Sequence, residues 1–78
     1  METMFEGVQA ILAKQLRVDP GRVVPEARIK KDLGADSVDI LQLMIRIEDR
    51  YGIAVPDQEA AAFETVADVV AYLEKQEV

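Results

Sequence analysis

The sequence contains no cysteine and no histidine among its 78 residues. The absence of cysteine excludes disulfides, thiolate metal sites and reactive thiols, and the absence of histidine removes the commonest general base and neutral metal ligand. A serine in this chain therefore has no obvious side chain to activate it as a nucleophile. We expect no catalytic residue and no metal site, and we expect any serine to be modified by another enzyme.

Long apolar segments are also absent. No hydrophobic run reaches the roughly 20 residues that a transmembrane helix needs, and the first residues lack the basic and apolar regions of a signal peptide. We therefore expect a cytoplasmic protein that does not bind membranes. Half of the residues are hydrophobic, so residues 1–78 are expected to form one small domain with a modest core.

Acidic side chains are concentrated in the second half of the chain. The formal net charge is -6; residues 1–35 carry five acidic and six basic side chains, and residues 36–78 carry ten acidic and three basic ones. An acidic surface disfavours nucleic acid as a partner and favours basic proteins.

The first 35 residues are predicted to form a helix and a long connection. Thr3 and Glu6 have the spacing of a capping box, and apolar residues at positions 5, 8, 12 and 16 share one face of a helix that should end near Arg17. Asp19 is expected to cap a short turn in the connection. The connection is too apolar to be free, and we expect three of its residues to pin it onto the helices: Val23, Val24 and Ile29.

Three further helices are predicted after the connection. The first covers residues 37–51 and ends at Gly52, a short one covers residues 58–63, and the last follows Thr65, with Asp68 at the capping-box position. The predicted fold class is all-α: a small four-helix bundle with a long loop between helices 1 and 2 and a short helix 3.

The helix over residues 37–51 is apolar on two sides. One stripe, expected to face the core, consists of Ile40, Leu43, Met44, Ile47 and Tyr51; the other consists of Val38, Leu41 and Ile45. One small bundle can hardly bury both stripes, so the second stripe is predicted to dock a partner. The alternative is that the long connection covers it.

The start of this helix carries the most distinctive run of the sequence, D-L-G-A-D-S followed by an apolar residue and aspartate. Asp36 is a good N-cap residue, and Asp39 can reach back to it as in a capping box. Ser37 would lie in the first turn and be open to solvent. The free N–H groups and partial positive charge of a helix N-terminus tolerate a phosphate at this position.

The run resembles the phosphopantetheine attachment motif of acyl carrier proteins. The resemblance extends to I-E-D-R-Y-G-I-A-V-P-D and T-V-A-D-V-V-A-Y-L, and so covers nearly the whole chain. It implies a non-enzymatic carrier in which a phosphopantetheinyl transferase attaches 4′-phosphopantetheine from coenzyme A to Ser37, next to Asp36. The thiol of that arm would carry acyl groups as thioesters. It also implies a bundle of acyl-carrier type, which we expect to be a monomer.

The resemblance further implies partners and an acyl cleft. Ketoacyl synthases, acyltransferases and related enzymes of fatty acid or polyketide biosynthesis would dock on the second helix, at Val38, Asp39, Leu41, Gln42, Ile45, Arg46, Glu48 and Asp49. The acyl chain would fold into a cleft lined by Leu43, Ile47, Ile53, Phe63 and Val66.

The sequence departs from the family pattern in ways that leave the pathway open. Val38 replaces the usual leucine, and Gln42, Arg46 and Arg50 stand where acidic or small residues are common. Fatty acid synthesis enzymes dock on this helix through basic patches, so a less acidic helix suggests altered partner choice, as in a specialised carrier. The basic residues Arg28, Lys30 and Lys31 either steer a phosphate-bearing reactant or belong to a solvated loop.

Three other functions fit parts of the sequence. A peptidyl or aminoacyl carrier would use the same arm, and a helical adaptor without a prosthetic group would not need Ser37. A calcium-binding loop starting at Asp32 is excluded, because it would place Leu43 where a bidentate glutamate is required.

Overall fold

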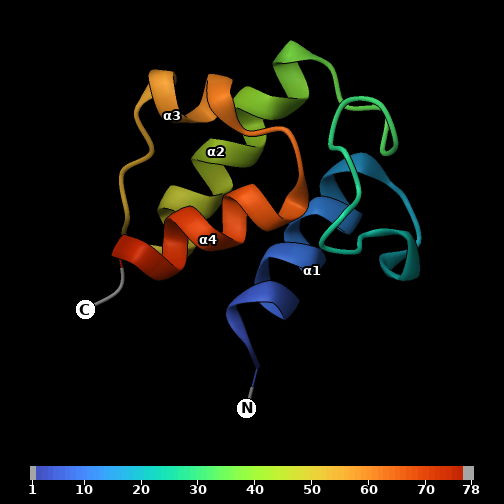
Figure 1. The fold of residues 1–78 in the computed structure, drawn as a ribbon, viewed down its shortest axis with the longest axis horizontal. Helices are drawn as coiled ribbons and strands as arrows, with labels where there is room; N and C mark the ends of the chain where they lie inside the picture. Colours follow the sequence, from blue (N-terminus) through green and yellow to red (C-terminus); the bar gives the residue numbers. More distant parts are fainter. Residues whose placement is uncertain (1, 77–78) are drawn as a thin grey trace.

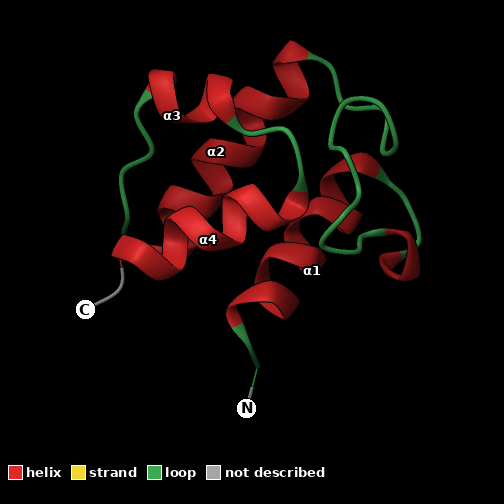
Figure 2. Ribbon diagram, in the orientation of Figure 1, coloured by secondary structure: helices red, strands yellow, loops and turns green. Residues whose placement is uncertain are grey.

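The computed structural model describes residues 2–76, which fold into an all-helical bundle (Figures 1 and 2). The helices are α1 (Met4–Leu16), α2 (Ser37–Tyr51), α3 (Asp57–Ala62) and α4 (Val66–Gln76), with a 3-10 turn, η1, at Pro20–Arg22. The predicted fold class is confirmed, including the long connection after α1 and the short third helix. None of the helices in this part of the chain has the length and hydrophobicity of a transmembrane span.

Short-range caps set the helix ends. Thr3 and Glu6 exchange two hydrogen bonds at the start of α1, Glu6 N to Thr3 Oγ1 at 3.1 Å and Thr3 N to Glu6 Oε1 at 2.8 Å. Thr65 and Asp68 do the same at the start of α4. Each pair satisfies backbone N–H groups that a helix start leaves without partners. Both predicted capping boxes are confirmed.

The third helix is the least supported. It runs over residues 57–62 rather than the predicted 58–63, has Pro56 at its N-cap position and lacks a side-chain cap. Phe63 ends it in an extended conformation and packs edge-on against Tyr72, with ring centroids 5.6 Å apart. A six-residue helix is marginal by itself, so α3 depends on such contacts.

The core lies where α1, α2 and α4 meet. Its fully buried side chains include Val8 and Leu12 of α1, Leu43 and Ile47 of α2, and Leu73 of α4. Ile40 and Tyr51 of the predicted core stripe are half-buried at its edge. Burial of a leucine or isoleucine contributes about 1.5–3 kcal/mol, so this cluster is the main source of stability.

The connection between α1 and α2 is a wall of this core. Val23 and Ile29 are buried as predicted, whereas Val24 is 39% exposed and the prediction for it was wrong. Neighbouring residues in extended chain point to opposite sides, so burial of Val23 turns Val24 outward. Backbone hydrogen bonds from Ile29 N to Glu64 O (2.9 Å) and from Val66 N to Ala27 O (3.0 Å) fasten the connection to the segment before α4.

Gly7 allows α1 and α2 to approach closely. A methyl group at this position would collide with the hydroxyl group of Tyr51.

Glycine normally costs a helix interior about 1 kcal/mol relative to alanine. We predict that Gly7→Ala destabilises the protein all the same, because Tyr51 must move. In a Tyr51→Phe background, the effect of Gly7→Ala on the free energy of unfolding should be about 1 kcal/mol more favourable than in the wild-type background. A double-mutant cycle measured by urea unfolding gives this difference. Additive effects of the two changes would contradict this packing.

A second prediction concerns the stability of the protein at low pH. Hydrogen bonds from the backbone N–H groups of Thr65 and Glu64 lower the pKa of Asp68. In the unfolded chain the Asp68 carboxylate has an ordinary pKa, so it is protonated at a higher pH than in the folded protein. The stabilisation by these hydrogen bonds is therefore present above the unfolded-state pKa and is lost as the pH falls through the lower folded-state pKa. Asp68→Asn should be less stable than wild type at neutral pH and should lose less stability between about pH 5 and pH 2. An equal fall in the melting temperature of wild type and Asp68→Asn over this pH range would contradict the prediction.

Candidate functional site

Ser37 is the first residue of α2 and the only serine in the sequence. Asp36 caps the helix: its Oδ1 accepts from Asp39 N at 2.8 Å, and Asp39 Oδ2 accepts from Asp36 N at 3.2 Å. The predicted capping box is therefore confirmed. It uses both flanking carboxylates and leaves Ser37 exposed to solvent.

The loop before Ser37 is held by buried side chains and backbone hydrogen bonds. Leu33 and Ala35 are each 6% exposed, and Ala35 N donates to Ile29 O at 3.1 Å. Between them, Gly34 takes a φ of 75°, which favours glycine. The alternation of buried and turned-out residues fixes the direction in which the chain enters α2, and so the position of Ser37.

Asp32, the first residue of the motif, closes the same loop. Its Oδ2 accepts from the backbone N of Arg28 at 2.8 Å, and its carbonyl oxygen accepts from Arg22 Nη2 at 3.0 Å. The backbone and side-chain hydrogen bonds from Arg28 lower the pKa of Asp32. This aspartate therefore stabilises the loop, and no metal-binding group of three or more His, Cys, Asp or Glu side chains occurs among residues 2–76.

Ser37 Oγ has no hydrogen-bond partner in the described part of the chain, and the sequence contains no histidine to act as its base. The hydroxyl group is accessible but not activated. The arrangement suits a residue that receives a group from another enzyme better than one that attacks a substrate itself.

A groove of about 240 Å³ opens beside Ser37, between α2 and α3. Its lining is mainly apolar, with one cation and one carboxylate, and consists of Lys30, Ser37, Ile40, Leu41, Met44, Val55, Asp57, Ala60, Ala61 and Phe63. A lining of this kind accepts an apolar ligand with a charged end.

The predicted cleft residues lie mostly elsewhere. Phe63 lines the groove, but Leu43, Ile47 and Val66 have no exposed surface and belong to the closed core. Ile53 is half-buried against that core. None of these four residues lines the groove in this conformation, and their contact with an acyl chain stays a prediction.

Four residues of the groove were not predicted from the sequence: Ile40, Met44, Val55 and Ala60. Ile40 and Met44 follow Ser37 by three and seven positions, which places them on the same side of the helix as the serine. That spacing was the available signal for both. Val55 and Ala60 could not be found in this way, because they come from other segments.

The second apolar stripe of α2 is open to solvent. Val38 is 61% exposed, and Leu41 and Ile45 are each 57% exposed. The alternative that the long connection covers the stripe is therefore excluded. Exposed apolar side chains in a row beside Ser37 suit a docking surface, since monomeric proteins rarely leave such patches without a use.

The polar residues predicted for docking have different surroundings. Gln42 and Arg46 are exposed and joined through Gln15 of α1, whereas Glu48 is half-buried and its Oε2 accepts from Val55 N at 2.5 Å. Asp49 is exposed. The carboxylate of Glu48 thus holds the loop after α2 by accepting from the backbone of Val55.

Comparison with known proteins agrees with the motif and the fold. A family model described as a phosphopantetheine attachment site matches residues 6–73. The acyl carrier protein of Helicobacter pylori (strain G27) is 46% identical over 71 residues, which cover 91% of each chain. That of Thermosynechococcus vestitus is 46% identical over 70 residues, 90% of this chain and 86% of the relative.

A solved structure from Mycobacterium tuberculosis, named for an acyl carrier protein, superposes with a TM-score of 0.89 at 31% identity. The superposition covers 95% of this chain and 99% of the other. The chain therefore belongs to the family of acyl carrier proteins, which bind phosphopantetheine and act as carriers rather than enzymes.

Proposed function

We propose that Ser37 is the residue to which phosphopantetheine is attached. The observation that carries this proposal is its position: the only serine of the chain lies exposed at the first residue of α2, at the mouth of a mainly apolar groove. Among residues 2–76, Thr3 and Thr65 also stand at helix starts, but neither lines this groove.

The residues around Ser37 fit a phosphate linked to a long, partly apolar arm. The 15-residue helix α2 presents its N-terminal N–H groups and partial positive charge at the serine, and both favour a phosphate. Lys30 lines the same groove and adds a cation. When bound, the group supplies a thiol that carries acyl chains as thioesters.

In this function the chain positions and shelters its cargo. The capping box and the loop before it hold Ser37 in place. Ile40, Met44 and Phe63 offer an apolar surface on which an acyl chain can be kept from water.

We further propose that phosphopantetheinyl transferase and the synthases and acyltransferases of fatty acid or polyketide biosynthesis dock on Val38, Leu41 and Ile45. The cytoplasmic location expected from the sequence remains part of this proposal.

Modification at Ser37 is tested by intact-mass measurement. The protein is incubated with coenzyme A, Mg²⁺ and a broad-specificity phosphopantetheinyl transferase. We expect wild type to gain the mass of one phosphopantetheine and Ser37→Ala to gain none. Thr3→Ala, which removes the cap hydroxyl of α1, is the matched control and should be modified like wild type. No gain by folded wild type, with a known carrier modified in parallel, would favour the adaptor interpretation.

Sheltering of the acyl chain is tested by filling the groove. Ala60 is half-buried and lines it, so Ala60→Leu should occupy part of the 240 Å³. We expect an eight-carbon acyl chain to raise the melting temperature of the wild-type protein by several degrees, since about 1 kcal/mol shifts a domain of this size by roughly 4–8 °C. Ala60→Leu should lose most of this increase.

The control for the groove is Ala71→Leu, at an exposed position of α4 outside it. This variant should keep the acyl-dependent increase. An increase of the same size in all three proteins would mean that the chain is sheltered elsewhere, and no increase in wild type would mean that it stays in solvent.

A further inference from the structure

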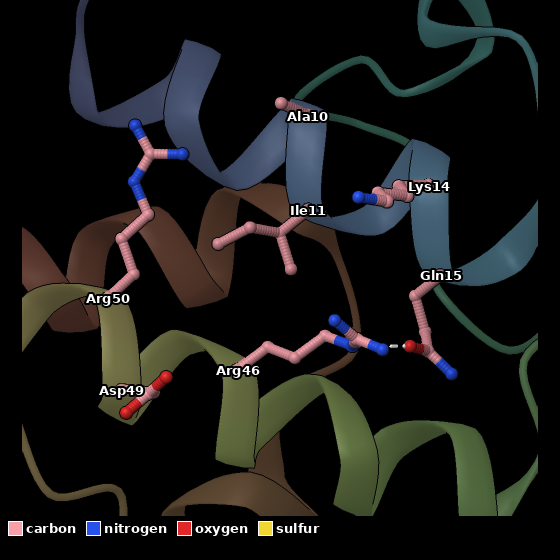
Figure 3. Close-up of a pocket in the computed structure, with 7 residues that line it drawn as sticks. All are labelled: Ala10, Ile11, Lys14, Gln15, Arg46, Asp49 and Arg50. Carbon is pink, nitrogen blue, oxygen red and sulfur yellow. Dashed lines mark hydrogen bonds between the residues drawn. The ribbon is translucent and has the colours of Figure 1, made fainter.

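A second groove, of about 310 Å³, lies between α1 and α2 (Figure 3). Three cationic side chains surround its apolar floor at Ile11: Lys14, Arg46 and Arg50. Only one carboxylate, that of Asp49, lines it. The groove is thus a basic area on a chain whose net charge is -6.

Folding leaves fewer carboxylates of α2 facing the groove than its composition suggests. Of its acidic residues and cap, Asp36 and Asp39 are engaged in the capping box, where the partial positive charge of the helix N-terminus offsets them. Glu48 is turned to the backbone of Val55. Asp49 is therefore the one carboxylate of α2 that faces the groove.

The cations of the groove are less compensated. Arg50 pairs with Glu2, but Arg46 bonds only to the neutral Gln15, and Lys14 forms no ion pair with any residue in 2–76. Two positive charges thus face solvent without an acidic partner. A ligand with carboxylates would complement them.

Gln15 fixes Arg46 in a useful orientation. Its Oε1 accepts from Arg46 Nε at 2.6 Å, and its Nε2 donates to Gln42 Oε1 at 2.7 Å. The two terminal nitrogens of Arg46 make no hydrogen bond within the described residues. A guanidinium held at Nε with both terminal nitrogens available is prepared for a bidentate carboxylate.

The basic groove is continuous with the exposed stripe of α2. A neighbouring hollow is lined by Gln42, Ile45, Arg46 and Asp49, so Ile45 of the stripe and Arg46 of the groove border the same space. We propose that the docking surface of this carrier takes a protein partner whose contact patch combines apolar side chains with carboxylates. The proposal rests on the proposed function, in which α2 docks partners. It adds that the preferred partner of this chain differs in the charge of its contact patch from enzymes that dock through basic patches.

The proposal is tested with two synthetic helical peptides. Both carry one stripe of leucines; in one the stripe is flanked by glutamates, and in the other by lysines. Binding is followed by NMR shifts of ¹⁵N-labelled protein. We expect the glutamate peptide to bind at least tenfold more tightly, to shift the amides of Lys14, Ile45 and Arg46, and to lose this advantage in high salt.

Variants connect the preference to the groove. Arg46→Glu should lower the affinity for the glutamate peptide at least tenfold, and Arg46→Gln should have an intermediate affinity. Lys31→Glu makes a charge change in a different groove, next to α3, and should have less than a twofold effect. Thermal unfolding checks that each variant is folded.

Several outcomes would overturn the proposal. Equal binding of the two peptides, or tighter binding of the lysine peptide, would show that α2 prefers neutral or basic partners. Saturable shifts of the same amides with sodium phosphate alone would mean a site for a free anion. A concentration-dependent dimer without peptide would mean that a second copy occupies the surface. Attachment at Ser37 is measured separately by intact mass on Arg46→Glu, so failure of the charge preference is distinguishable from failure of the carrier function.

Discussion

One helix has to serve both the core and the surface, and the rest of the structure is arranged around that constraint. The buried side of α2 contributes Leu43, Met44 and Ile47, while Leu41 and Ile45 stay exposed on its other side. The other helices and the long connection leave Val38, Leu41 and Ile45 of α2 exposed. Because the exposed side cannot be covered by so short a chain, it is available to partners.

The position of Ser37 follows from the same arrangement. The connection between α1 and α2 is buried at Val23, Ile29 and Leu33 and fastened to the segment before α4, so its end is fixed where α2 begins. Asp36 then turns the chain into the helix. The result is a hydroxyl group that is accessible and still held in one place, as the proposed attachment of phosphopantetheine to Ser37 requires.

Electrostatics in this protein depend on which charges remain free after folding. The sequence between Asp36 and Arg50 has four acidic side chains and two basic ones. Folding directs Glu48 to the backbone of Val55 and brings Lys14 of α1 to the same groove as Arg46. An acidic stretch thereby presents a basic groove beside its apolar stripe. This placement sets the charge of the partner that we propose for it.

The sequence by itself determined the features that depend on residues a few positions apart: the capping boxes, the helix bounds to within one residue, the motif at Ser37 and the two stripes of α2. Hydrogen bonds and side-chain periodicity within one helix are local, so they can be predicted from spacing. Only the tertiary structure decided that Leu43 and Ile47 are sealed in the core and that Val55 and Ala60 line the groove. It also decided which charges of α2 stay free, because these outcomes depend on contacts between segments distant in the sequence, such as Gln15 with Gln42.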